Sequence, residues 1–227
     1  MRNGLFTSSS IHLLTSKGTA KDSFGKPALT YIAEKRMEIR LGRSLNSDKS
    51  SRPTSWGNLV EQRVFDLLPM DYKYQSDERY KHETLPFSGA PDMITDTKVC
   101  DIKCPFTLKS FCEQVDTFKD WEDWKALKPE YYWQLVSNAI LTEKNIGEII
   151  IYCPYKSELL EIREMCANYL GDQNKIAWVN WASDDELPYL KDGGYYKNIN
   201  IMSFEIPDED KEFLINRIKL ATEKLEL

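Results

Sequence analysis

The chain has 227 residues, of which 41% are hydrophobic and 29% charged, and its formal net charge is −6. This length allows one large or two small domains with a buried core, the composition is that of a soluble globular protein, and no apolar run is long enough to span a membrane. The net charge disfavours a nucleic-acid partner, but residues 1–60 hold 10 Lys/Arg against 4 Asp/Glu, while the remainder holds 20 against 32. A basic N-terminal third can still offer a positive groove, although a solvated face of uneven charge explains the same pattern.

The cysteines argue against a disulfide framework. Their number is odd, and no pair has the C-x-x-C spacing of a zinc or iron–sulfur site. We therefore expect reduced thiols and a cytoplasmic protein. The five positions are Cys100, Cys104, Cys112, Cys153 and Cys166.

The N-terminal segment begins with hydroxyl side chains at positions 7–10, directly before an apolar run. This pattern is typical of a helix N-cap, which is the default interpretation. A helix start with exposed N–H groups beside Arg2 is also suited to bind a phosphate group. The pattern then predicts a mobile loop over 15–26, a helix over 27–41 and a polar loop over 43–54.

Residues 55–68 predict a helix of about fourteen residues, near the usual length. Glu61 falls among its apolar positions, so its carboxylate either meets solvent at the edge of the helix or points into a site. Residues 71–86 alternate polar and apolar side chains and favour a strand region.

The most informative stretch is GAPDMITDTKVCDIKCP, residues 89–105. On a strand, Asp101 and Lys103 share one face, while Cys100 and Ile102 point into the opposite layer. Asp92 can meet Asp101 across a hairpin. Two carboxylates and an ammonium that converge are suited to a hard divalent cation and the water it activates.

Residues 106–128 are charged and aromatic, and we interpret them as an insertion or a loop with helical turns. Residues 129–141 predict a helix, because Pro129 suits a first turn. On it Tyr131, Gln134 and Asn138 form a polar stripe, which must find protein partners or lie beside a site.

The remainder alternates strands and helices: we expect strands over 148–152, 175–181 and 198–206, and helices over 157–169 and 207–227. No repeat or linker divides the chain. The economical prediction is one α/β domain over residues 1–227, with a central mixed sheet flanked by helices.

Phosphodiester cleavage assigns roles to these residues. Asp92, Asp101 and the carbonyl of Ile102 would hold Mg²⁺, for which Mn²⁺ can substitute. Lys103 would orient or deprotonate water, Glu61 would add a carboxylate, and Gln134 and Tyr131 would hold the water or a phosphate oxygen. For any one of these residues alone, an ordinary surface or core role is the default.

The combined motifs resemble the lambda-exonuclease-like viral recombination nucleases of the Pro-Asp…Asp/Glu-x-Lys superfamily. The resemblance is carried in order by RNGLFTSSSI at 2–11, Trp56-Gly57 with Glu61, Ala90-Pro91-Asp92, DIKCPFT at 101–107, Tyr131-x-x-Gln134, and Tyr152 with Pro154. The family often has Glu in place of Asp101. It also has a serine where this chain has Ala90, so Ser88 is the substitute phosphate contact.

The resemblance implies a restriction-endonuclease-like core and a 5′→3′ exonuclease on linear double-stranded DNA, giving 3′ overhangs for phage-type recombination in a bacterial host. It further implies that Arg2 and Ser9 bind the 5′-phosphate, that the chain forms a homotrimer, and that a single-strand annealing protein is a partner. Two alternatives stay open: a structure-specific or restriction-like endonuclease, and a non-catalytic module that binds DNA ends.

Overall fold

The computed structural model describes residues 4–45, 51–69, 72–74, 79–169 and 172–225. The α-helices are α1 (Lys26–Leu41), α2 (Arg52–Leu67), α3 (Leu108–Thr117), α4 (Trp121–Leu127), α5 (Pro129–Thr142), α6 (Leu159–Ala167), α7 (Gln173–Ile176), α8 (Trp178–Trp181) and α9 (Asp208–Glu223). Short 3₁₀ helices are η1 (Ser8–Thr15), η2 (Lys156–Glu158) and η3 (Asp184–Glu186). The strands are β1 (Phe6–Thr7), β2 (Lys73–Tyr74), β3 (Tyr80–Lys81), β4 (Phe87–Gly89), β5 (Met93–Ile94), β6 (Lys98–Lys103), β7 (Ile146–Tyr152) and β8 (Ile199–Glu205).

The central sheet has the order β2-β5-β6-β7-β8. Strands β6 and β7 are parallel, and the other neighbours are antiparallel. The connection between β6 and β7 contains α3, α4 and α5, as a parallel crossover requires. A smaller sheet has the order β1-β4-β3, in which β1 and β4 are parallel. The predicted mixed sheet flanked by helices is therefore confirmed.

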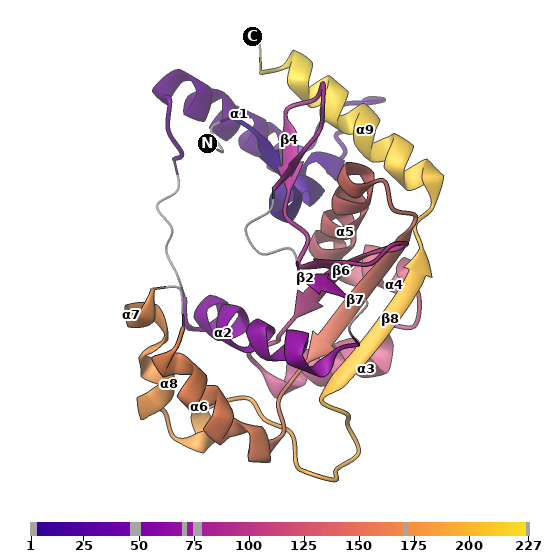
Figure 1. Ribbon diagram of the computed structural model, residues 1–227. Coiled ribbons are helices and arrows are strands. Elements are labelled where there is room, and N and C mark those ends of the chain that lie inside the picture. The colour runs from indigo at the N-terminus through magenta and orange to yellow at the C-terminus, as the bar shows by residue number, and fades with distance from the viewer. Residues whose placement is uncertain (1–3, 46–50, 70–71, 75–78, 170–171, 226–227) are drawn as a thin grey trace.

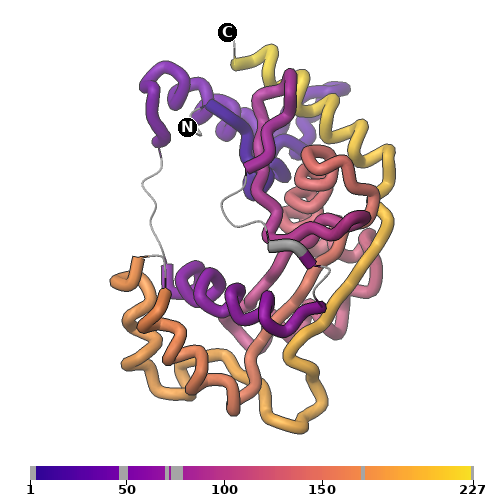
Figure 2. The backbone as a smooth tube through the Cα atoms, in the orientation of Figure 1, coloured from indigo at the N-terminus to yellow at the C-terminus, as the bar shows by residue number. Residues whose placement is uncertain are grey.

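Alternate side chains of β6 and β7 enter two different cores. Val99, Ile149 and Ile151 pack with residues of η1, α5 and α9. Cys100 and Ile102 pack with residues of α2 and α6. This two-sided burial is what a central strand pair requires. Figures 1 and 2 show α2 on one side of the sheet and α5 with α9 on the other.

Local signals position the helices around the sheet. The Ser51 hydroxyl accepts a hydrogen bond from the backbone N–H of Thr54 and caps α2. Pro129 occupies the first turn of α5, where its missing N–H is not needed. Gly42 ends α1 with φ 66°, a conformation that glycine adopts without strain.

Two sequence expectations were wrong. Residues 175–181 are helical and not a strand, because Asp172 caps α7 and the buried Ile176 and Val179 have helical spacing. Residues 106–128 form α3 and α4, capped by Thr107 and Asp120, and not an insertion or a loop. Residues 15–26 connect η1 to α1 as a loop, as expected, and a bridge between Lys17 and Phe24 closes this loop into a short hairpin.

All five cysteines are free thiols. Within the described residues, no helix combines the length and the apolar character that crossing a bilayer demands.

Candidate active site

The β5–β6 hairpin brings the two predicted metal-binding carboxylates together. Met93 lies opposite Cys100, so Asp92 and Asp101 are the next facing positions. One Asp92 carboxylate oxygen accepts a hydrogen bond of 2.6 Å from the backbone N–H of Ile102. The Asp101 side chain is completely buried at the end of β6. The short hairpin thus fixes both carboxylates against the same strand end.

Lys103 shares the face of Asp101, as the strand alternation predicts. Its ammonium lies 2.5 Å from Asp101 Oδ2 and 3.4 Å from Gln134 Oε1. The Gln134 amide donates to Asp101 Oδ1 at 2.9 Å. The Tyr131 ring centroid lies 4.6 Å from the Lys103 Nζ, within range of a cation–π contact. Helix α5 therefore holds both members of the Asp101–Lys103 ion pair.

Glu61 approaches this cluster from α2. Burial raises the pKa of its carboxyl to about 7, helped by repulsion from Asp101 and opposed by Lys103. Burial, Asp101 and Glu61 likewise raise the pKa of Asp92 well above its ordinary value. Burial lowers the pKa of Lys103, but attraction to Asp101 and Asp92 outweighs that effect and raises it above the ordinary value. Three ionised carboxyls around one lysine would carry an excess of negative charge, and the raised pKa values of Glu61 and Asp92 express that cost, which another cation would relieve.

The donor set fits Mg²⁺. Asp101 Oδ2 contacts the Lys103 ammonium and has no further hydrogen-bond partner among the described residues. In the same residues, no three His, Cys, Asp or Glu side chains form a ready metal cluster. Mg²⁺ usually keeps several waters and takes one or two carboxylates together with substrate phosphates. Two aspartates and a backbone carbonyl therefore suit it better than they would suit an ion that needs an all-protein cage.

The predicted phosphate contacts lie on adjacent elements. The parallel pairing of β1 with β4 sets Thr7 beside Ser88. Ser9 follows on η1, and its hydroxyl lies 3.3 Å from that of Thr7. Ser88 is buried, and the Arg79 guanidinium donates to its hydroxyl at 3.4 Å. Arg2 lies outside the described residues.

The GAPD motif has a glycine at position 89 because neighbouring side chains leave no room for a Cβ there. A Cβ at this position would lie 2.2 Å from both Asn138 Oδ1 and Ser8 Oγ. Ser8 in turn is 2.9 Å from the Ser137 hydroxyl. The backbone of β4 can approach α5 and η1 this closely only without a side chain. This contact joins the hydroxyl-bearing elements to the turn that carries Asp92.

Sequence reasoning missed two residues of this region. Arg79 gave no signal, because its place beside Ser88 depends on the pairing of β3 with β4. Asn138 was recognised only as part of the polar stripe on 129–141. It is fully buried, and neither of its side-chain polar atoms has a hydrogen-bond partner among the described residues. Buried polar groups without hydrogen bonds cost free energy and are rare in folded proteins, so Asn138 is an unusual residue of this region.

The sequence profile of the YqaJ-like viral recombinase domain matches residues 1–145, which is more than half of the chain. No curated protein sequence matches this chain.

Several solved structures share the fold. LHK-Exo, an alkaline exonuclease from Laribacter hongkongensis, superposes with a TM-score of 0.64 at 17% identity, over 99% of this chain and 89% of its own. LHK-Exo in complex with dAMP gives a TM-score of 0.63 at 18% identity, with the same coverage. A phage-related exonuclease from Haemophilus somnus 129PT gives 0.63 at 16% identity, over 97% of this chain and 93% of its own.

Proposed function

The chain belongs to the YqaJ-like viral recombinase family, and from that premise we propose that it is an Mg²⁺-dependent 5′→3′ exonuclease on linear double-stranded DNA. Family and fold together indicate a DNA exonuclease. Digestion in this direction leaves 3′ single-stranded overhangs, the substrate of strand annealing. The dAMP that LHK-Exo binds is the kind of mononucleotide that exonucleolytic cleavage releases.

The observation that carries the proposal is the buried Asp101, which faces Asp92 and contacts Lys103 and Gln134. Asp92, Asp101 and the Ile102 carbonyl would hold the ion. When bound, Mg²⁺ would lower the pKa of a water and neutralise charge on the phosphoryl oxygens. Mn²⁺ has the same preference for oxygen ligands and would substitute.

The protein residues supply orientation and charge. The Lys103 ammonium would orient the attacking water and stabilise negative charge on the phosphoryl group. Gln134 holds the Asp101 carboxylate in place, and Tyr131 limits where the ammonium can lie. Glu61 adds a third carboxyl from the opposite layer.

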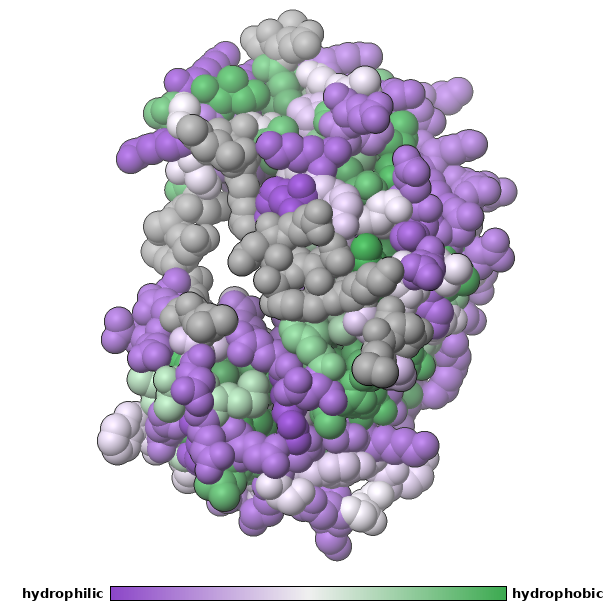
Figure 3. Space-filling view, in the orientation of Figure 1, coloured by the Kyte–Doolittle hydropathy of each residue, from purple (hydrophilic) through white to green (hydrophobic). Residues whose placement is uncertain are grey.

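Recognition of the DNA end is assigned to the hydroxyl-bearing elements. Ser9 and Ser88 would donate to a 5′-phosphate, and Arg79 and Arg2 would supply positive charge. Ser88 precedes Asp92 by four residues on the same β4–turn–β5 segment, so a phosphate held there would lie on the path to the candidate catalytic carboxylates. Figure 3 shows a gap between the part of the molecule that carries α1 and the part that carries α2, and the proposal places the duplex end there.

Two associations complete the proposal. Family resemblance favours a homotrimer, and the 3′ overhang favours a single-strand annealing protein as partner. Helix α1 exposes apolar side chains that a second copy could cover, namely Leu29, Met37, Ile39 and Leu41. Sedimentation at several protein concentrations tests the assembly.

The deciding experiment uses singly end-labelled linear duplex and a closed circle of the same sequence, with Mg²⁺, Mn²⁺ or EDTA. The proposal expects release of labelled mononucleotide from the 5′-labelled strand, loss of activity in EDTA and an intact circle. Cutting of the circle would favour an endonuclease. Binding of linear DNA without hydrolysis would favour a non-catalytic end-binding module.

End recognition has its own test. A duplex with 5′-phosphates should be digested faster than the same duplex with 5′-hydroxyls, and Ser9→Ala should narrow that difference. Equal digestion rates on both substrates would mean that Ser9 does not bind the 5′-phosphate and has only a structural role in η1.

A further inference from the structure

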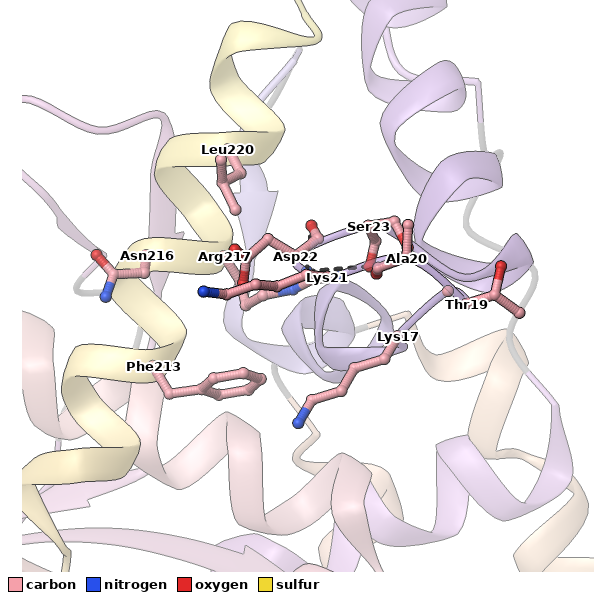
Figure 4. Close-up of a pocket in the computed structure, with 11 residues that line it drawn as sticks. Lys17, Thr19, Ala20, Lys21, Asp22, Ser23, Phe213, Asn216, Arg217 and Leu220 are labelled. Carbon is pink, nitrogen blue, oxygen red and sulfur yellow. Dashed lines mark hydrogen bonds between the residues drawn. The ribbon is translucent and has the colours of Figure 1, made fainter.

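Two adjoining cavities flank Phe213 on α9, away from the candidate active site. One, of about 470 Å³, lies between the hairpin of residues 17–23 and α9 (Figure 4). The other, of about 420 Å³, lies between α9 and the start of α5 and reaches Lys125. Lys17 and Phe213 line both cavities, which therefore adjoin at these two side chains, and we name the two cavities together the α9 groove.

Arg217 gives this groove an ordered wall. Its side chain is buried, and its guanidinium lies 3.8 Å from the Phe24 ring centroid. It donates to four carbonyls of the hairpin region, those of Leu14, Ser16, Asp22 and Ser23. Because these contacts occupy the guanidinium, Arg217 fixes the hairpin and the lysines present the positive charge of the groove.

Two adjacent aromatic rings lie between two ammonium groups in the groove. The Lys17 Nζ lies 5.2 Å from the Phe213 ring centroid. The Phe213 and Trp133 rings lie 5.5 Å apart. The Lys125 Nζ lies 5.4 Å from the Trp133 ring centroid and is paired with Asp210 at 2.6 Å. In Figure 4, Lys17 and Lys21 both extend from the hairpin toward α9.

The groove has a definite length and charge. From Asp210 to Leu220 the helix rises about 15 Å at 1.5 Å per residue. This length matches four to five residues of extended peptide at about 3.3 Å each. The lining cations are Lys17, Lys21, Lys125 and Arg217, and the lining acids are Asp22 and Asp210. A local excess of positive charge on a chain of net charge −6 attracts an acidic ligand.

We propose that the α9 groove binds an extended, acidic peptide segment of a protein partner, with an aromatic or aliphatic side chain seated beside Phe213 and Trp133. Carboxylates of the peptide would pair with Lys17 and Lys21, which are exposed. Hydrophobic anchors between charged contacts are the usual basis of such recognition.

A nucleic-acid strand fits the groove less well. On α5, Gln134 contacts Asp101 whereas its neighbour Trp133 contacts Phe213, so the groove and the candidate catalytic carboxylates lie on different faces of that helix. The carboxylates of Asp22 and Asp210 would also repel a nucleic-acid backbone, which carries one negative charge per nucleotide. A peptide can place apolar residues at those two points. A partner bound here would leave the candidate active site open to DNA.

Fluorescence anisotropy tests this assignment without DNA or metal ion, so failure of the nuclease proposal would not affect the result. The probe is a fluorescein-labelled peptide of alternating aspartate and phenylalanine. Saturable binding is expected, and the double variant Lys17→Glu, Lys21→Glu should weaken it by roughly tenfold or more, because two attractive contacts become repulsive.

The control is the double variant Lys109→Glu, Lys219→Glu, which makes the same charge change at exposed lysines outside both cavities. It should bind the peptide as the unmodified chain does, and circular dichroism should show both variants folded. No binding, or equal weakening in both variants, overturns the proposal. So does stronger binding of a single-stranded oligothymidylate that is lost in the Lys17, Lys21 variant, since that result makes the groove a nucleic-acid site.

Discussion

Lys103→Met removes the ammonium at the centre of the candidate active site while keeping most of its apolar stem. The Lys103 side chain is 15% exposed and its partner Asp101 is fully buried. Breaking a buried pair by removing one partner costs about 3–5 kcal/mol, because the other charge stays buried and uncompensated. For a chain of this size each kcal/mol lowers the melting temperature by roughly 2–4 °C, so the lower bound of about 3 kcal/mol predicts a decrease of about 6–12 °C without metal ion.

The same substitution should strengthen the response to Mg²⁺. The ammonium both neutralises Asp101 and repels a divalent ion, so its loss leaves Asp92 and Asp101 to the ion alone. Addition of Mg²⁺ should therefore raise the melting temperature of the variant more than that of the unmodified chain. Turnover on end-labelled duplex should fall by about 10²–10³, the cost of removing one group that stabilises transition-state charge.

Lys98→Met is the matched control, because Lys98 begins the same strand and pairs at 2.6 Å with Glu148, which is also fully buried. This variant should lose stability too, but it should keep its turnover per folded molecule and gain no extra response to Mg²⁺. Undiminished turnover of Lys103→Met would remove Lys103 from the chemistry. An equal increase in melting temperature with Mg²⁺ in all three proteins would show that the ion does not bind at Asp92 and Asp101.

Three further outcomes are expected. Gly89→Ala should lower the free energy of unfolding by about 1–3 kcal/mol, because its Cβ meets Asn138 and Ser8 at 2.2 Å; denaturant titration measures this, and Gly57→Ala, with nothing within 4 Å of the added Cβ, should not destabilise. Glu148→Gln should destabilise the fold at pH 7 and progressively less toward pH 3. Burial raises the pKa of Glu148, but hydrogen bonds from Lys98, Ser203 and Tyr72 outweigh burial and lower the pKa below the ordinary 4.5. The Glu148 carboxylate therefore stabilises the fold above pH 4.5, and this stabilisation is lost as the pH falls through the lower folded pKa. Equal destabilisation at both pH values would contradict that assignment. Arg217→Lys cannot make all the carbonyl contacts of the guanidinium and should speed tryptic cleavage within residues 17–23; unchanged protection would mean that the hairpin is held by other contacts.

Short-range sequence patterns were sufficient to predict much of the secondary structure and the faces of strand β6. Strand alternation placed Asp101 and Lys103 on one face of β6 and Cys100 with Ile102 on the other, since the pleat allows no other arrangement. Helices α1, α2, α5 and α9 were predicted close to their observed bounds. Their apolar periodicity and their caps are local in sequence, so no tertiary information was needed.

Other features depended on tertiary contacts. The segment 175–181 is rich in apolar and aromatic residues that also suit a strand, and its helical form is stabilised both by the local Asp172 cap and by the packing of Ile176 and Val179 against α2 and α6. The hairpin at 17–24 has local backbone hydrogen bonds and is also held by Arg217, some two hundred residues away in the chain. No local pattern predicts a contact at that separation.

The sequence by itself determined the chemical content of the candidate active site, because two carboxylates and a lysine on a short hairpin converge through backbone geometry alone. Only the tertiary structure decided which distant groups complete that site. Gln134 reaches Asp101 because the crossover that joins two parallel strands lays α5 over their ends. Arg79 meets Ser88 because β3 pairs with β4. These contacts arise from strand pairing and layer packing, which are properties of the folded chain and not of any one segment.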